Sequence, residues 1–215
     1  MSSVFSASEL LLRPIVFTRP LRLVDPTSWV PHIPFAFWLI DALRPRVVVE
    51  LGTMSGNSFS AFAQAVQILG LESACYAVDT WRGDEHSGLY GDEVFQEWST
   101  FHDPRFGAFS RLVRSTFDEA LTKFDDGSID LLHIDGYHTY EAVRHDFESW
   151  LPKLSASAVV LLHDRRILSE RSHAREDSRS LALETPHLQE RLELQGATIE
   201  RQEAELAQLS AEGVA

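Results

Sequence analysis

The sequence of 215 residues contains a single cysteine, Cys75, and lacks any apolar run of the roughly 20 residues needed to cross a bilayer. One cysteine cannot build an internal disulfide framework or a zinc site of several thiolates. Cations are also scarce, since 19 Lys and Arg stand against 32 Asp and Glu, a formal net charge of −13. This balance argues against nucleic acid and an anionic membrane as partners, because both require clustered cations. The start of the chain has no cationic leader, so we expect a cytoplasmic protein.

Aromatic residues are absent from residues 165–215, although the rest of the chain holds 13 Phe, 5 Trp and 4 Tyr. A segment without rings is not expected to share a densely packed core. We therefore predict a folded domain over residues 1–164, with a helical or lid segment at 1–44, and a polar, partly ordered helical tail over 165–215. Leu192, Ile199 and Leu206 repeat every seven residues, so a helix over 186–209 either self-associates or remains solvated.

Short apolar runs alternate with helical patterns between residues 45 and 164. The runs predicted to be strands lie at 47–51, 76–79, 109–113, 129–135 and 158–164. Helices are predicted at 32–43, 58–69, 92–100, 117–123 and 140–150. This alternation predicts an α/β fold with a doubly wound, mostly parallel sheet.

A turn with two glycines follows the first predicted strand, in the run Glu50-Leu51-Gly52-Thr53-Met54-Ser55-Gly56-Asn57-Ser58. Gly52 permits a sharp turn, and Gly56 lets a ligand approach the backbone where the helix begins. Asp79 ends the next strand, where a carboxylate can accept ribose hydroxyls. Glu50 suits the ammonium of an amino-acid-bearing nucleoside, whereas the middle glycine of a dinucleotide fingerprint is missing. The alternative is an ordinary strand–turn–helix.

Acids and histidines lie at or just after the ends of the last two predicted strands: Asp135, His138, His163 and Asp164. In a parallel sheet these side chains should converge at the carboxyl edge, beside Asp79. Carboxylates with neighbouring imidazoles can hold a divalent cation, and a neutral histidine can take a proton from a substrate hydroxyl. The alternatives are a turn at Asp135-Gly136 and a helix cap at His138, and His133 is expected to be a core or edge histidine.

The segment from Asp79 to Gly91 has the glycines, rings and charges of a loop that closes over a ligand. Its candidate substrate or lid residues are Trp81, Asp84, His86 and Tyr90, of which Trp81 and Tyr90 could stack on a sugar or adenine. An ordinary surface loop is the other interpretation.

The run Glu50–Ser58 resembles motif I of the class I S-adenosylmethionine-dependent methyltransferases, in the form typical of catechol O-methyltransferase-like enzymes. The pattern I-D-G-x-H-x-Y-E-x-V-x-x-D, followed by a strand that ends H-D, is similar to the macrocin O-methyltransferase and cephalosporin-hydroxylase-like branch. The resemblance implies a Rossmann-like fold that binds S-adenosylmethionine. The residues it implies at the cofactor are Glu50, Gly52, Thr53, Gly56, Asn57, Ser58, Asp79, Ser115 and Asp135.

By the same resemblance, Asp135 and Asp164 with His163 hold Mg²⁺, and His138 is the catalytic base. The implied reaction methylates a hydroxyl of a sugar or another small molecule. Alternatives are an inactive methyltransferase-like binding module and, less favoured, an NAD-dependent oxidoreductase. The resemblance ends after Asp164, so we expect the last two strands of the family's seven-stranded sheet to be missing.

Overall fold

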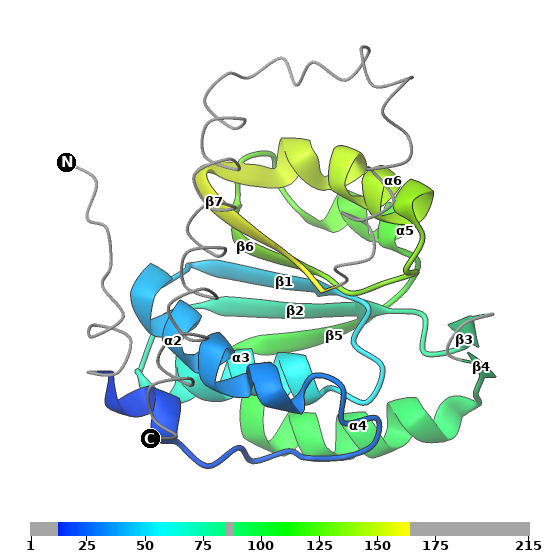
Figure 1. The fold of residues 1–215 in the computed structure, drawn as a ribbon. Helices are drawn as coiled ribbons and strands as arrows, with labels where there is room; N and C mark the ends of the chain where they lie inside the picture. Colours follow the sequence, from blue (N-terminus) through cyan, green and yellow to red (C-terminus); the bar gives the residue numbers. More distant parts are fainter. Residues whose placement is uncertain (1–12, 85–87, 164–215) are drawn as a thin grey trace, which may run out of the picture. The chain divides into compact units, whose positions relative to one another are not determined.

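The computed structural model describes residues 13–84 and 88–163 (Figure 1). The predicted tail, His86 and Asp164 lie outside the described residues, and so does the side chain of Asp84. Within the described part of the chain, no helix combines the length and the apolar character that a membrane span requires.

Five parallel strands form the central sheet in the order β5-β2-β1-β6-β7. They are β1 (Val47–Leu51), β2 (Ala74–Asp79), β5 (Ser110–Arg114), β6 (Ile129–Ile134) and β7 (Leu154–Leu162). Strand β1 is at the centre of the sheet. On one side of it lie β2 and then β5, and on the other side lie β6 and then β7. The five predicted strands and the doubly wound α/β class are confirmed, and the carboxyl edge between β1 and β6 is where such folds bind ligands.

Helices cover both faces of the sheet, as Figure 1 shows. One face carries α2 (Ile33–Leu43), α3 (Asn57–Ile68) and α4 (Asp92–Phe106), and the other carries α5 (Phe117–Ala120) and α6 (Tyr140–Trp150). The 3-10 turns are η1 (Pro14–Phe17), η2 (Val30–His32), η3 (Leu121–Lys123) and η4 (Leu151–Lys153). The helices predicted at 32–43, 58–69 and 140–150 match within one residue, whereas α4 continues six residues past its predicted end.

A two-stranded hairpin and the start of β7 also differ from the sequence prediction. The segment after Asp79 contains a small antiparallel hairpin of β3 (Gly83–Asp84) and β4 (Gly88–Leu89), which is too short to show any apolar pattern. Strand β7 begins at Leu154, four residues before the predicted start, because Leu154 pairs with Ile129 of β6. Pairing with a neighbouring strand extends β7 over small residues that have little strand propensity of their own.

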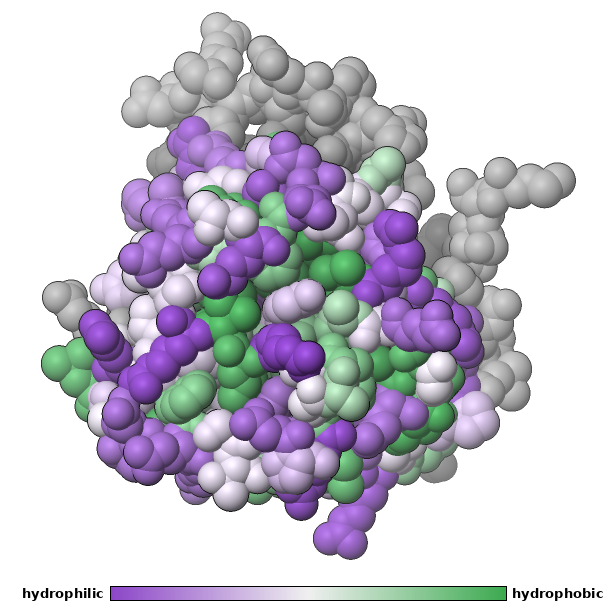
Figure 2. Space-filling model, turned by 180° about the vertical axis from the view of Figure 1, so that it is seen from behind, coloured by the Kyte–Doolittle hydropathy of each residue, from purple (hydrophilic) through white to green (hydrophobic). Residues whose placement is uncertain are grey.

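Side chains of β1 alternate between two apolar cores. Val48 faces α2 and α3, where it joins Phe62 and Trp98, while Val49 faces Trp150 of α6. By the same alternation Glu50 points into the first core. On the outer surface, Figure 2 shows hydrophilic side chains with hydrophobic patches between them.

Candidate active site

A cavity of about 640 Å³ opens at the carboxyl edge of the sheet. Its volume lies within the range of small-molecule sites. Loops that follow each of the five strands contribute to its wall, together with the segment that precedes α2 and the β3–β4 hairpin. Nine of the predicted site residues line it: Gly52, Thr53, Asn57, Ser58, Asp79, Tyr90, Asp135, His138 and His163. Residues predicted from widely separated motifs thus line one cavity.

Asp79 holds the glycine-containing turn in place. One of its carboxylate oxygens accepts hydrogen bonds from the backbone N–H groups of Thr53 and Met54, both at 2.9 Å, and the other accepts from Trp81 N–H at 2.7 Å. A carboxylate offers about four acceptor directions, so about one remains for a ligand hydroxyl. The predicted contact with a ribose stays a prediction, now limited to about one hydrogen bond in this conformation.

The two glycines of the turn are required by protein packing. A Cβ on Gly52, at φ +84°, would lie 2.1 Å from the carbonyl oxygen of Asp135. A Cβ on Gly56, at φ +81°, would lie 2.7 Å from the ring of Trp98. Gly56 does not line the cavity, and the indole of Trp98 is what requires a glycine there; the predicted close approach of a ligand stays a prediction.

Asn57 lines the cavity, but its side-chain amide forms hydrogen bonds with the chain segment before α2. Its Oδ1 accepts from Val24 N–H at 3.1 Å, and its Nδ2 donates to the carbonyl oxygens of Val24 and Pro26 at 2.7 and 3.0 Å. These bonds hold Pro26, Ser28 and Trp29 against the cavity. Asn57 therefore shapes the wall in addition to any contact with a cofactor.

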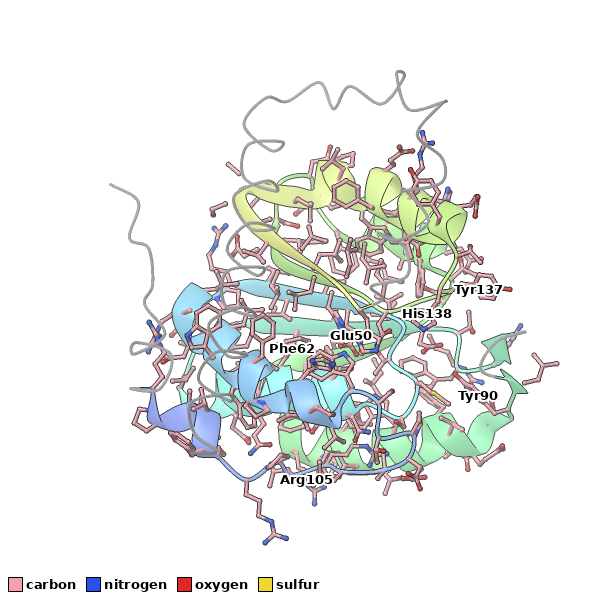
Figure 3. All side chains as sticks on the ribbon, in the orientation of Figure 1. Glu50, Phe62, Tyr90, Arg105, Tyr137 and His138 are labelled. Atoms are coloured by element: carbon pink, nitrogen blue, oxygen red, sulfur yellow. The ribbon has the colours of Figure 1, made fainter. Side chains whose placement is uncertain are left out.

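Glu50 lies beneath the cavity, in the core between β1 and α3 (Figure 3). Its carboxylate is fully buried and its Oε2 lies 2.8 Å from Nδ1 of His133, which is 1% exposed. Glu50 does not line the cavity, and its hydrogen-bond partner is His133; the predicted direct contact with a cofactor ammonium stays a prediction. Glu50 and Asp79 do share one face of the sheet by strand alternation.

His133 is the buried core histidine that its strand position predicted. Burial alone would lower the pKa of His133, but the hydrogen bond and charge of Glu50, with a contribution from Asp135, raise this pKa above its usual value. Trp29 and Phe62 pack against the imidazole with ring centroids 5.3 and 5.6 Å away. The ring is therefore held by one acid and two aromatic neighbours.

The predicted acid–histidine constellation is brought together at the carboxyl ends of β6 and β7. Nε2 of His138 lies 3.9 Å from Oδ1 of Asp135, and the rings of His138 and His163 are 6.1 Å apart. One ligand atom from each of His133, Asp135 and His163 lies within 4.8 Å of the other two. Asp135 and His163 line the cavity, while Asp164, the other predicted metal ligand, is outside the described residues.

The predicted lid residues have different surroundings. Trp81 is fully buried, packs on Phe95 with centroids 5.0 Å apart, and donates its indole N–H to the carbonyl oxygen of Met54 at 3.0 Å. It supports the turn from behind and does not line the cavity, which corrects the prediction of a stacking role. Tyr90 does line the cavity, as does His138, and both are labelled in Figure 3.

Several lining residues were missed by the sequence reasoning. Thr116 and Phe117 line the wall after β5, whereas the predicted Ser115 does not. Thr116 also caps α5 in a capping box with Glu119, and that Thr-x-x-Glu signature was legible in the sequence. Trp29 and Ser28 belong to a segment without a repeating pattern, so no comparable signal was available for them.

Comparison with known proteins adds family evidence. A family model described as a methyltransferase domain matches residues 49–165. A protein of Sinorhizobium fredii, y4gI, is 49% identical over 162 residues, which cover 75% of this chain and 18% of that protein. This chain therefore spans less than a fifth of the length of that curated relative.

Two solved structures are similar to this chain at low sequence identity, and the first of them shares its fold. Cofactor-bound Rv0187 from MTB superposes with a TM-score of 0.51 at 16% identity, covering 76% of this chain and 66% of that one. The O-methyltransferase TomG from Streptomyces achromogenes, in complex with SAM, gives a TM-score of 0.49 at 14% identity, covering 74% of this chain and 63% of that one.

Proposed function

Because this chain belongs to the methyltransferase-domain family, we propose that it binds S-adenosylmethionine in the 640 Å³ cavity and methylates a hydroxyl of a small acceptor such as a sugar. The observation that carries the proposal is the convergence of Asp79, the Gly52 turn and the Asp135–His138 segment on one cavity at the carboxyl edge of the sheet. Cofactor-binding and proton-accepting groups thus border the same space.

The cavity fits the cofactor in size and in the placement of its polar groups. Asp79, at 9% exposure, presents the remaining part of its carboxylate to the cavity, and Thr53 follows Gly52 along the same wall. Thr116 and Phe117 supply a half-polar, half-aromatic wall after β5, suited to a nucleoside base. Bound S-adenosylmethionine would supply an electrophilic methyl group on a sulfonium.

His138 is the proposed base. Its side chain is 38% exposed, lines the cavity, and has the Asp135 carboxylate 3.9 Å away to stabilise the imidazolium that forms. The acceptor oxygen would bond to the methyl carbon, the carbon–sulfur bond of the cofactor would break with its electron pair left on sulfur, and His138 would take the hydroxyl proton. Most of the acceleration then comes from holding oxygen and carbon in line.

A divalent cation is part of the proposal. Asp135 and His163 are the described cavity residues that would hold it, and its positive charge would favour ionisation of the acceptor hydroxyl. The set of donors includes more nitrogen than magnesium prefers, which bears on the identity of the ion.

Titration calorimetry with S-adenosylhomocysteine tests the proposal. We expect S-adenosylhomocysteine to bind to the wild-type chain and to His138→Gln. In a separate activity assay, methyl transfer to glycoside acceptors should be lost only in the variant. Binding without any turnover in the wild type would instead support an inactive binding module, and binding of NADH in preference to S-adenosylhomocysteine would support an oxidoreductase.

A further inference from the structure

We infer that His133, Asp135 and His163 form a three-ligand site for a first-row transition metal ion such as Fe²⁺, Co²⁺ or Zn²⁺, with Glu50 as the residue that orients His133. This inference rests on the proposed function only in placing the ion beside the acceptor hydroxyl. It replaces Mg²⁺ by an ion that prefers imidazole, and it gives the buried Glu50–His133 pair a role.

The geometry of the three groups supports such a site. His133 and Asp135 are two residues apart at the end of β6 and therefore share a face, and His163 directly follows β7, the neighbouring strand. One ligand atom from each residue lies within 4.8 Å of the other two, close enough for all three to contact one ion. Asp135 and His163 border the cavity, which leaves further coordination positions open to a substrate or water.

The hydrogen bond to Glu50 determines which nitrogen of His133 can act as a ligand. Nδ1 lies 2.8 Å from Oε2 of Glu50, so Nε2 is the nitrogen left for a metal. Metal-bound histidines commonly donate their second ring N–H to a carboxylate in this way, which fixes the tautomer and makes the ligand more basic. Glu50 is fully buried, and its Oε1 has no hydrogen-bond partner among the described residues. A buried carboxylate beside a histidine is better compensated when a cation is bound nearby.

The donor types select the ion. Two imidazoles and one carboxylate suit Fe²⁺, Co²⁺ or Zn²⁺, whereas Mg²⁺ favours oxygen ligands almost exclusively. Trp29 and Phe62 enclose the imidazole of His133 and keep that side of the site dry. A partly dehydrated pocket with nitrogen donors disfavours an ion that keeps most of its waters.

Cobalt is the probe that tests the inference, because the position and intensity of its visible absorption depend on the number and type of its ligands. The full chain is stripped with a chelator and titrated with Co²⁺ without any methyl donor. We expect one equivalent to bind with a visible d–d band that a large excess of Mg²⁺ does not remove. Equal or tighter binding of Mg²⁺, or the absence of the band, would overturn the inference.

Variants identify the ligands. His133→Asn should abolish the band, and Glu50→Gln, which keeps the shape of the side chain, should weaken Co²⁺ binding by about 10–100-fold. His145→Asn is the matched control, because that imidazole is exposed on α6 and bonded to Asp118 at 2.9 Å. Wild-type Co²⁺ affinity in both His133→Asn and Glu50→Gln would refute the site, and circular dichroism confirms that each variant is folded.

Binding of S-adenosylhomocysteine is measured on the same samples. Loss of Co²⁺ binding in His133→Asn with retained nucleoside binding supports the metal site. A wild-type chain that binds Co²⁺ but no S-adenosylhomocysteine would sink the proposed methyl transfer and leave the metal inference standing.

Discussion

Two buried histidines of this protein are each paired with an acid, yet only one of them, His133, packs against a residue that lines the cavity. His133 meets Glu50 through Nδ1 at 2.8 Å, beneath the residues that line the cavity. His102, in α4, meets Asp103 through Nδ1 at 2.7 Å and Ser110 Oγ through Nε2 at 2.8 Å. The second arrangement has the connectivity of a serine–histidine–acid triad. Ser110 and His102 are both 1% exposed and neither lines the cavity, so a substrate cannot reach the hydroxyl.

The comparison teaches that the pKa and possible role of a buried histidine depend on its distance from the cavity and on the burial of its acid partner. Hydrogen-bond connectivity alone does not decide them. The side chain of Glu50 is 0% exposed, whereas that of Asp103 is 69% exposed and its charge is screened by water. Accordingly the pKa of His133 is raised above its ordinary value. For His102 burial dominates, and it lowers the pKa despite the hydrogen bond that the ring donates to Asp103.

The largest expected effect is at the buried acid. Glu50→Ala leaves His133 without its partner and opens a void in the core, so we expect a loss of about 3 kcal/mol in the free energy of unfolding. Urea denaturation measures it. Glu148→Ala is the control, because that acid is 47% exposed and forms an i,i+4 pair with Arg144. If both variants lose the same small amount, the Glu50–His133 pair does not stabilise the fold.

A smaller loss is expected at the triad-like group. Ser110→Ala removes the partner of a buried ring nitrogen, which costs about 1–3 kcal/mol of unfolding free energy. Asp103→Ala removes an exposed partner and should cost less than about 1 kcal/mol. Neither variant should alter binding of S-adenosylhomocysteine in calorimetry. A specific loss of nucleoside binding in Ser110→Ala would show that this group communicates with the cavity.

The smallest expected effect is a difference in the pH dependence of stability. Burial holds the pKa of folded His102 below its ordinary value of 6.5. As the pH falls below about 6.5, the unfolded chain binds a proton that folded His102 does not, so the wild type loses stability toward acid. His102→Asn removes this contribution, and the gap in unfolding free energy between wild type and variant should shrink on the acid side. A gap that widens there would contradict the predicted sign.

Much of the fold followed from local patterns. Val47, Val48, Val49 and Leu51 put apolar side chains on both faces of the first strand, and this run made the strand predictable, as did the helical period at 140–150. Asp79, Asp135, His138 and His163 could be placed at one edge because parallel strands end together. Trp81 was wrongly predicted to be a lid residue, because a tryptophan in a glycine-rich segment is compatible with a position in a lid and with a position in the core.

Other features of the site depend on contacts between distant segments. Glu50 and His133 are 83 residues apart and meet because β1 and β6 pair with those two residues in register. Asn57 binds the segment around Val24 through backbone groups, which carry no side-chain signature. The requirement for Gly56 comes from Trp98, 42 positions later in the chain, whose ring occupies the space of a side chain.

The sequence by itself determined which five strands form the central sheet and that acids and histidines gather at its carboxyl edge. Those properties arise from short-range periodicity and from the common direction of parallel strands. Only the tertiary structure decided that Glu50 serves His133 instead of lining the cavity, because burial and partner choice depend on strand register. Hydrogen bonds in a dry core form between whichever groups that register brings together.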